Sequence, residues 1–293
     1  MKLKIYRIFA LVMLTMAAIA SCTKDYEDIK TLDERNISEY ISRNGLKVQP
    51  YDTTGLYYEV LKPGSGENLD YTQQIPLIYT VRSLDGSYIS QDTIVNHYSN
   101  YFGYYSPASI RDLMMKVLQK QGGSIRVILP SRKAYGRTGN KTLGIPGNAS
   151  LDFTISVLEK NKLPLYEEQM IKKYLGSDLQ NYTKSPDGIY YKIGNPGTGS
   201  VINQDSTLTV NYTGRLLNGV TFESNEGASV SLSRFITAWQ QAVPLVKVGG
   251  SIRFIFPSTL AYGLNGSTDQ TSGKVVIPAF SPLDFDVTVT AQK

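Results

Sequence analysis

The sequence predicts an α+β protein with two tandem domains, each a curved antiparallel β-sheet packed on one short α-helix. The main observation is a repeat, in which three segments of the first half return in the second: Gly55–Gly66 as Gly188–Gly199, Gly122–Gly136 as Gly249–Gly263, and Leu143–Val157 as Val275–Val289. The offset of about 130 residues is far longer than the roughly 20–50 residues of solenoid or propeller repeats. Each copy is therefore large enough to be a domain with its own core.

Alternating apolar and polar residues predict the strands. Leu283, Phe285, Val287 and Val289 alternate with Asp284, Asp286, Thr288 and Thr290. This period of two is typical of a strand with one buried face. The segments around Val210 and Phe254 show the same alternation.

A helical period predicts one helix between these strands. Apolar residues recur at helical spacing, at Phe235, Trp239, Ala242 and Val246. Ser233 is the predicted N-cap, and Pro244 and Gly249 limit the helix. One helix against an antiparallel sheet defines an α+β domain, and an apolar ligand site would lie between the two layers.

Composition indicates a globular protein that does not bind nucleic acid. The chain has 293 residues, of which 41% are hydrophobic and 19% charged. Its 30 Lys and Arg exceed its 25 Asp and Glu, but without Lys2, Lys4 and Arg7 the balance is 27 minus 25, or +2. No basic cluster stands out, as nucleic-acid binding would require.

Residues 1–21 have the layout of a secretory signal. A basic start precedes the 13-residue apolar run Ile8–Ala20, which is too short for a comfortable membrane span. The run ends in Ile19-Ala20-Ser21-Cys22, which resembles the lipobox of bacterial lipoproteins. The resemblance implies cleavage before Cys22 and lipidation of that residue, the alternative being a buried free thiol. Because Cys22 is the only cysteine, no disulfide stabilises either domain.

The lipobox implies a location in the bacterial cell envelope. Thr23 follows the cysteine in place of the Asp that retains lipoproteins in the inner membrane, so the resemblance implies an outer-membrane anchor facing the periplasm. Asp25, Glu27 and Asp28 faintly resemble a surface-export signal. These acidic residues therefore have two interpretations: a signal for exposure at the cell surface or, more simply, a soluble acidic tether.

Residues 22–53 and 161–185 each contain a predicted helix ahead of a domain. In the first, a tether with a short helix, Ile37, Tyr40 and Ile41 recur at helical spacing and Asn44-Gly45 is a stop signal. The second, a helical linker, contains the similar segment Leu165–Leu179. The sequence leaves open whether these helices pack on their domains or act as spacers.

The second copy carries a set of motifs in a fixed order. They are NYTG at 211–214, TFES at 221–224, SRFITAW at 233–239, VGGSIRFIFPSTLAYG at 248–263 and VIPAFSPLDFDV at 276–287. This set resembles the FKBP-type peptidyl-prolyl cis-trans isomerases. The resemblance is close over 186–293, which implies a complete isomerase domain there, and looser over 54–160.

The resemblance implies a proline pocket in the second domain. Its catalytic residues would be Tyr212, Phe222, Glu223, Trp239, Tyr262 and Phe285, and Phe235, Ile236 and Ile277 would contact the substrate. Trp239 would form the floor, Ile236 would offer its backbone N–H and Tyr262 its hydroxyl. Glu223 replaces the family's Asp, Ala228 stands where an aromatic residue is frequent, and Ala238 replaces a Gly. The Gly-, Ser- and Thr-rich stretch 264–275 would be a mobile flap.

The first copy is interpreted as a degenerate domain over 54–160. It retains Tyr79, Tyr135, Ile145 and Phe153 but has Ile89 and Ser90 in place of Phe222 and Glu223. Ungapped alignment puts Asp112 at the position of Trp239. A buried unpaired carboxylate is too costly to persist, so either this pocket opens to water or the helix shifts register to bring Ile110 or Leu113 inward. An insertion around the tyrosine-rich segment Asn96–Pro107 contains the lone His97, which is not expected to be catalytic.

The leading functional prediction is isomerisation of X-Pro bonds in exported proteins by the second domain. The barrier to this rotation is roughly 18–20 kcal/mol because of amide resonance. Twisting the bond reduces its charge separation, so an apolar enclosure disfavours the planar amide more than the twisted one. The chemistry therefore requires no cofactor and no metal. The alternative is a non-catalytic module, a chaperone or part of an envelope complex, that holds proline-containing polypeptide segments.

Overall fold

The computed structural model describes residues 27–293. The predictions made for residues 1–21 and for Cys22 lie outside this range. No helix within it is both long and apolar enough to cross a lipid bilayer.

Four α-helices and fifteen strands make up the described chain. The helices are α2 Ile29–Asn44, α3 Ala108–Val117, α4 Leu163–Leu175 and α5 Thr237–Ala242. The strands are β1 Gln49–Tyr51, β2 Leu56–Lys62, β3 Gln74–Ser83, β4 Ile89–Ser90, β5 His97–Tyr101, β6 Ser124–Leu129, β7 Leu151–Val157, β8 Thr183–Lys184, β9 Tyr190–Asn195, β10 Thr207–Leu216, β11 Thr221–Ser231, β12 Ser251–Phe256, β13 Ser267–Thr268, β14 Val275–Ile277 and β15 Leu283–Gln292.

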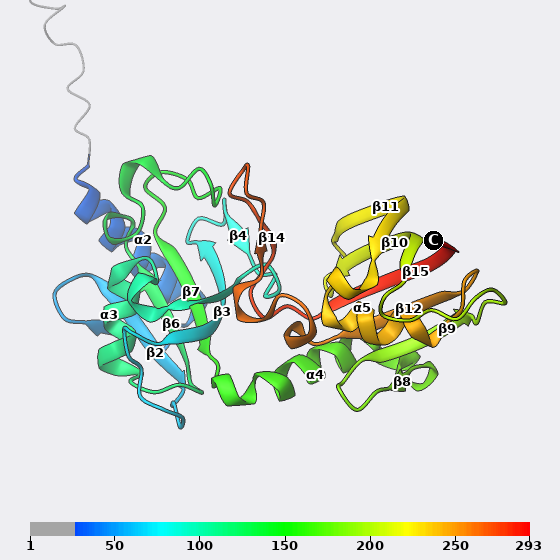
Figure 1. The fold of residues 1–293 in the computed structure, drawn as a ribbon. Coiled ribbons are helices and arrows are strands. Elements are labelled where there is room, and N and C mark those ends of the chain that lie inside the picture. Colours follow the sequence, from blue (N-terminus) through cyan, green and yellow to red (C-terminus); the bar gives the residue numbers. More distant parts are fainter. Residues whose placement is uncertain (1–26) are drawn as a thin grey trace, which may run out of the picture.

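The strands form two antiparallel sheets with the same topology. The first has the order β1-β2-β6-β7-β3-β4, with β5 also paired to β3, and the second has the order β8-β9-β12-β15-β10-β11. We call residues 29–157 the first unit and residues 163–292 the second unit. Figure 1 shows the two sheets apart from each other, with α4 between them. The predicted fold class, antiparallel sheet with a short helix, is confirmed.

Each sheet buries its apolar face against its own helix. In β15 the predicted inward residues Leu283, Phe285, Val287 and Val289 are all buried. They share one core with Trp239 and Ala242 of α5, whereas Ile110 and Leu113 of α3 belong to a separate core. The alternation thus identifies the residues that face this core, but Asp284, predicted on the exposed face, is buried as well, because Arg253 and Tyr174 of α4 bind its carboxylate.

The helix of the second unit is shorter than its apolar spacing predicts. Helix α5 spans only six residues, and Ser233 lies in a preceding 3₁₀ turn rather than at an N-cap. The Phe235 N–H closes that turn on the Leu232 carbonyl, and Phe235 itself is extended, which ends the turn before α5 begins. The N-cap prediction for Ser233 is therefore wrong, and Ile236 precedes the helix without a side-chain cap.

The helices that precede the two sheets are packed on them. Ile37 and Tyr40 of α2 join Leu84 and Ile128 in a small core, and Ile171 and Leu175 of α4 do the same with Tyr190 and Ile255. Helix α2 ends at Gly45, whose left-handed conformation (φ of 58°) matches the predicted stop. Residues 29–51 are thus part of the first unit rather than a tether extended away from it.

A buried carboxylate secures each of these helices to the loop after the central strand. The Asp33 carboxylate accepts hydrogen bonds from the Ser131 N–H and the Ser150 hydroxyl, at 3.0 and 2.8 Å. The Glu167 carboxylate accepts from the N–H and the hydroxyl of Ser258, at 2.6 and 2.8 Å. Burial raises the pKa of Glu167 to about 7, although both hydrogen bonds oppose the shift.

We expect Glu167 to make the protein less stable as the pH rises. Its pKa is higher in the folded chain than in the unfolded one, so the folded state binds more protons between these values and the free energy of unfolding falls from about pH 4.5 to pH 7. A shift of this size corresponds to about 3 kcal/mol. Glu167→Gln should remove this part of the slope in urea unfolding between pH 5 and pH 8. Glu168→Gln should keep it, because ion pairs with Lys172 and Lys184 lower the pKa of the half-buried Glu168 to about 2, below this window. An unchanged slope in Glu167→Gln would contradict the assignment.

The stretch 264–275, predicted as a flap, contains a hairpin in the structure. Strands β13 and β14 pair antiparallel, and the Asp269 N–H donates to the Lys274 carbonyl at 2.9 Å near the turn. Figure 1 shows this hairpin projecting from the second unit toward the first.

Candidate active site

Three strands and a short helix bring the predicted pocket residues of the second unit together. Tyr212 lies on β10, and Phe285 on the adjacent strand β15. Phe222 and Glu223 lie on β11, on the other side of β10. Trp239 comes from α5, which packs across the apolar face of the sheet. These side chains are up to 73 positions apart in the sequence, and the antiparallel pairing of the three strands makes them neighbours.

Trp239 is the centre of an aromatic cluster. Its ring centroid is 5.2 Å from that of Tyr212 and 5.4 Å from that of Phe285, both nearly perpendicular to it. Phe235 lies 4.8 Å away at an angle of 43°, and Phe222 meets Phe285 edge-on at 5.6 Å. Edge-to-face contacts place ring hydrogens against the electron-rich face of the indole, the arrangement that aromatic pairs prefer.

Trp239 is fully buried, with 0% of its surface exposed. Its indole Nε1–H has no hydrogen-bond partner within residues 27–293. The half-buried Phe222 and Phe235 lie at the margin of the cluster. A ligand ring that reaches the indole must therefore displace one of these margin side chains.

Gly214 was not identified as a site residue by sequence reasoning, although it ends the NYTG motif. A Cβ at this position would lie 2.6 Å from the Phe222 ring and 2.8 Å from the Phe285 ring. Only glycine therefore allows the two rings to meet over β10. Phe254 was likewise predicted only as core, and it stacks on Phe285 at 6.0 Å from beneath.

The polar end of the cluster is built by Tyr212 and Glu223. The Tyr212 hydroxyl donates a 2.6 Å hydrogen bond to Glu223 Oε1, so the longer carboxylate still reaches its partner. Burial, together with this bond, raises the pKa of Tyr212 above its usual value. Burial and the Glu223 charge also raise the pKa of Tyr262. Both hydroxyls therefore stay protonated at neutral pH, and that of Tyr262 is able to donate to a ligand carbonyl.

The remaining predicted residues border the same cluster. Ile277 at the end of β14 is buried in the core that contains Trp239, and Phe235 and Ile236 pack against that core. The Ile236 backbone N–H precedes the first turn of α5, where amides take no part in the helix's own hydrogen bonds. All nine predicted pocket residues thus lie in or next to one cluster.

The first unit has an open cavity at the corresponding place. Its volume is about 370 Å³, and six tyrosines contribute to its walls: Tyr79, Tyr88, Tyr98, Tyr104, Tyr105 and Tyr135. Tyr79 and Phe153 are 6.4 Å apart at 46°, nearly the geometry of Tyr212 and Phe285, at 6.2 Å and 41°. Burial raises the pKa of Tyr79 to about 12, so its hydroxyl is neutral.

Asp112 does not occupy the floor of this cavity. Its side chain is 51% exposed and accepts a hydrogen bond from Arg111. Ile110 and Leu113 are both buried, which is the predicted alternative of a shifted helix register. The ungapped alignment failed here because the insertion before α3 changes how the helix enters the core, and the buried Tyr105 now lines the cavity. Ile89, which the first copy has in place of Phe222, is exposed.

No group of three or more potential metal ligands occurs among residues 27–293.

Comparison with known proteins places residues 199–290 in a family model described as FKBP-type peptidyl-prolyl cis-trans isomerase. The chain is 32% identical over 115 residues to the FKBP-type peptidyl-prolyl cis-trans isomerase FkpA of Buchnera aphidicola, covering 38% of this chain and 45% of that protein. It is 38% identical over 82 residues to the outer membrane protein MIP of Legionella longbeachae, covering 27% and 35%. A solved peptidyl-prolyl cis-trans isomerase from Pseudomonas syringae is 25% identical, with a TM-score of 0.40 and coverage of 46% and 96%. The chain thus spans less than half the length of these two sequence relatives.

Proposed function

We propose that the second unit isomerises X-Pro bonds, because residues 199–290 match a family model described as FKBP-type peptidyl-prolyl cis-trans isomerase. The observation that supports this most is the cluster of Tyr212, Phe222, Trp239 and Phe285, with one carboxylate-bound hydroxyl at its polar end. A proline ring bound among these side chains would be shielded from water. The Tyr262 hydroxyl and the Ile236 N–H would then face the peptide backbone.

The rate enhancement follows from differential stabilisation of the twisted amide. The planar amide is the more polar state, and an aromatic enclosure replaces water with groups that solvate this polarity poorly. A hydrogen bond from Tyr262 or Ile236 to a neighbouring carbonyl fixes the chain on either side of the rotating bond. Each gain of about 1.4 kcal/mol for the twisted state multiplies the rate by ten, so a few kcal/mol suffices.

The proposal is tested by NMR exchange spectroscopy on a short proline peptide with and without the full chain. We expect catalytic amounts of the protein to increase the cis–trans exchange rate. Binding of the peptide with an unchanged exchange rate would overturn catalysis and favour a binding module.

A second candidate function, peptide binding without catalysis, is favoured for the first unit. Its cavity of about 370 Å³ retains the tyrosine walls but has Tyr105 at its base instead of an indole. Tyrosines combine apolar contact area with a hydroxyl donor, which suits uncharged extended segments. The pair of units would then hold one proline-containing client at two places.

The location of the protein is also a proposal. The MIP relative is named an outer membrane protein, and the lipobox ending in Cys22 supports a lipid anchor in the bacterial envelope, with exported polypeptides as clients. We expect Cys22→Ala to move the protein from the membrane fraction to the soluble fraction or to leave it as an unprocessed precursor. Membrane retention of a correctly cleaved variant would contradict the anchor.

A further inference from the structure

The first unit contacts the second through Asp92 and Ile94, just before the tyrosine-rich insertion, and through His97 within it. Ile94 is buried in the core that contains Trp239. The Asp92 carboxylate accepts a hydrogen bond from the Asn218 amide, in the turn between β10 and β11. His97, the first residue of β5, packs against the segment that follows β14, and only 8% of its surface is exposed.

His97 makes three direct contacts with that segment, one of them between its Nδ1 and the Ser281 hydroxyl at 3.5 Å. Its ring stacks on Phe280, with centroids 4.1 Å apart and planes 16° from parallel. Its Nδ1 lies 2.9 Å from the Ala279 carbonyl oxygen and donates to it. Tyr166 of α4 covers the other side, 6.3 Å from the imidazole. Figure 1 shows the β14 hairpin reaching toward the first unit.

Phe280 has a backbone conformation that bulky residues rarely adopt. Its φ is +41°, in the left-handed region, and its side chain is fully buried. Such a conformation persists only where the surroundings hold it in place. The stacked imidazole is part of those surroundings.

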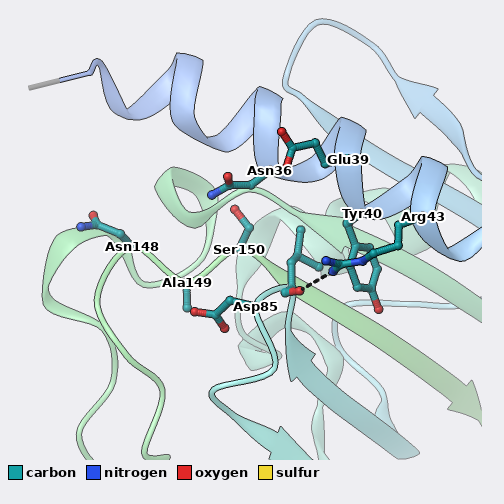
Figure 2. A pocket seen from close by; sticks show the side chains of 9 residues that line it. Asn36, Glu39, Tyr40, Arg43, Asp85, Asn148, Ala149 and Ser150 are labelled. Atoms are coloured by element: carbon teal, nitrogen blue, oxygen red, sulfur yellow. Dashed lines mark hydrogen bonds between the residues drawn. The ribbon is translucent and has the colours of Figure 1, made fainter.

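The repeat supplies a comparison for this strained turn. Asn148 occupies the equivalent position in the first unit, with φ of +58°, and asparagine tolerates this region. The N–H of Asn148 donates to the Gly136 carbonyl and that of Phe280 to the Gly263 carbonyl, both at 2.8 Å. Figure 2 shows the exposed Asn148 side chain at a small open pocket beside α2. Phe280, in contrast, is buried against the His97 ring. The turn is shared, and the buried aromatic side chain is specific to the unit that His97 contacts.

This turn is connected to two residues of the candidate active site. Gly263, which accepts the Phe280 N–H, directly follows Tyr262. Ile277 lies three residues before Phe280, at the end of β14. A change in the Phe280 turn therefore moves the backbone on either side of the pocket margin.

We propose that His97 of the first unit is a positioning residue for the candidate active site of the second, acting through Phe280 on Tyr262 and Ile277. This inference rests on the proposed function of the second unit. It gives the tyrosine-rich insertion a role, because the insertion carries the imidazole into the other unit. Burial lowers the pKa of His97 to about 4, against the opposing effects of the Ala279 carbonyl and Asp92, so the imidazole is neutral at physiological pH. Nε2 has no partner within residues 27–293.

The inference is tested in the full chain by hydrogen–deuterium exchange over 262–281 and by isomerase kinetics. His97→Ala should increase exchange at the Phe280 turn about tenfold by opening it locally, and should lower kcat/KM about fivefold. His97→Phe, which keeps the stacked ring, should show exchange and kcat/KM close to those of the wild type. Tyr101→Ala, an exposed position on the same strand, is the matched control and should change neither.

Unchanged exchange in His97→Ala, or an equal increase in Tyr101→Ala, would overturn the inference. If His97→Ala fails to fold, His97→Phe and His97→Asn give the same comparison, because only the former keeps the stacked ring; equal exchange in the two would then overturn it. Exchange is measured without peptide, so it is independent of catalysis. A wild-type chain that does not catalyse would therefore refute the proposed function while leaving the positioning contact to be judged by exchange alone.

Discussion

Replacing Trp239 with alanine should lower kcat/KM for X-Pro isomerisation about 100-fold, which corresponds to roughly 2.7 kcal/mol of lost stabilisation of the twisted amide. The indole contacts Tyr212, Phe235 and Phe285 and forms the largest buried surface of the cluster. Without it, water or a collapsed side chain fills the space below the proline ring. The measurement is the exchange rate of a proline peptide by NMR at a temperature where the variant is folded.

Trp239→Phe is the control for folding. Truncation of a buried tryptophan to alanine costs about 3–5 kcal/mol of stability, so loss of activity alone does not separate catalysis from unfolding. Phenylalanine keeps an aromatic core but gives a smaller platform, and we expect a folded protein with an intermediate rate. Full activity in a folded Trp239→Ala protein would show that the indole is only a core residue.

Asp284→Ala should destabilise the second unit by about 3 kcal/mol, because removing one partner of a buried ion pair leaves the other uncompensated. The Asp284 side chain is 0% exposed and binds Arg253 through both oxygens, at 3.0 and 2.8 Å. It also accepts a 2.8 Å hydrogen bond from Tyr174 of α4. Arg253 is 35% exposed and can regain some water, which favours the lower end of the range for buried pairs.

Asp286→Ala, two residues along the same strand, is the matched control. Its carboxylate pairs with Arg215 at 2.6 Å but is 48% exposed. Exposed pairs contribute about 0–1 kcal/mol. Urea unfolding should therefore separate the two variants clearly, and equal destabilisation would show that burial does not decide the cost here.

The sheets could be predicted from the sequence because their signal is local. Alternation such as that from Leu283 to Val289 reports one buried face without reference to the rest of the chain. The repeat then indicated that both halves share one fold, and the two sheets have the same strand order. The pocket residues around Trp239 were expected only from the resemblance of the motifs to the FKBP-type isomerases, and the structure places Trp239, Tyr212 and Phe285 together.

Other features could not be predicted because they depend on contacts between distant segments. The docking of α2 and α4 rests on Asp33 and Glu167, whose partners lie about 90 to 120 residues further on. The position of Asp112 was misjudged because the insertion changes the path into α3. The length of α5 was overestimated because Phe235 and Val246 pack inward from non-helical backbone. His97 carries no sequence signal for its contact with Phe280.

The measurement that tests the central claim most directly removes one tyrosine hydroxyl from each unit in turn and compares the effects on the isomerisation rate. Tyr262 and Tyr135 occupy equivalent positions of the repeat, and each is changed to phenylalanine in the full chain, with the cis–trans exchange rate of a proline peptide followed by NMR. Loss of one hydrogen bond in the twisted state is worth about 1–1.5 kcal/mol, so Tyr262→Phe should lower the rate about five- to tenfold. Tyr135→Phe should leave it unchanged. The opposite pattern, with the rate lowered by Tyr135→Phe and kept by Tyr262→Phe, would contradict the assignment of catalysis to the second unit.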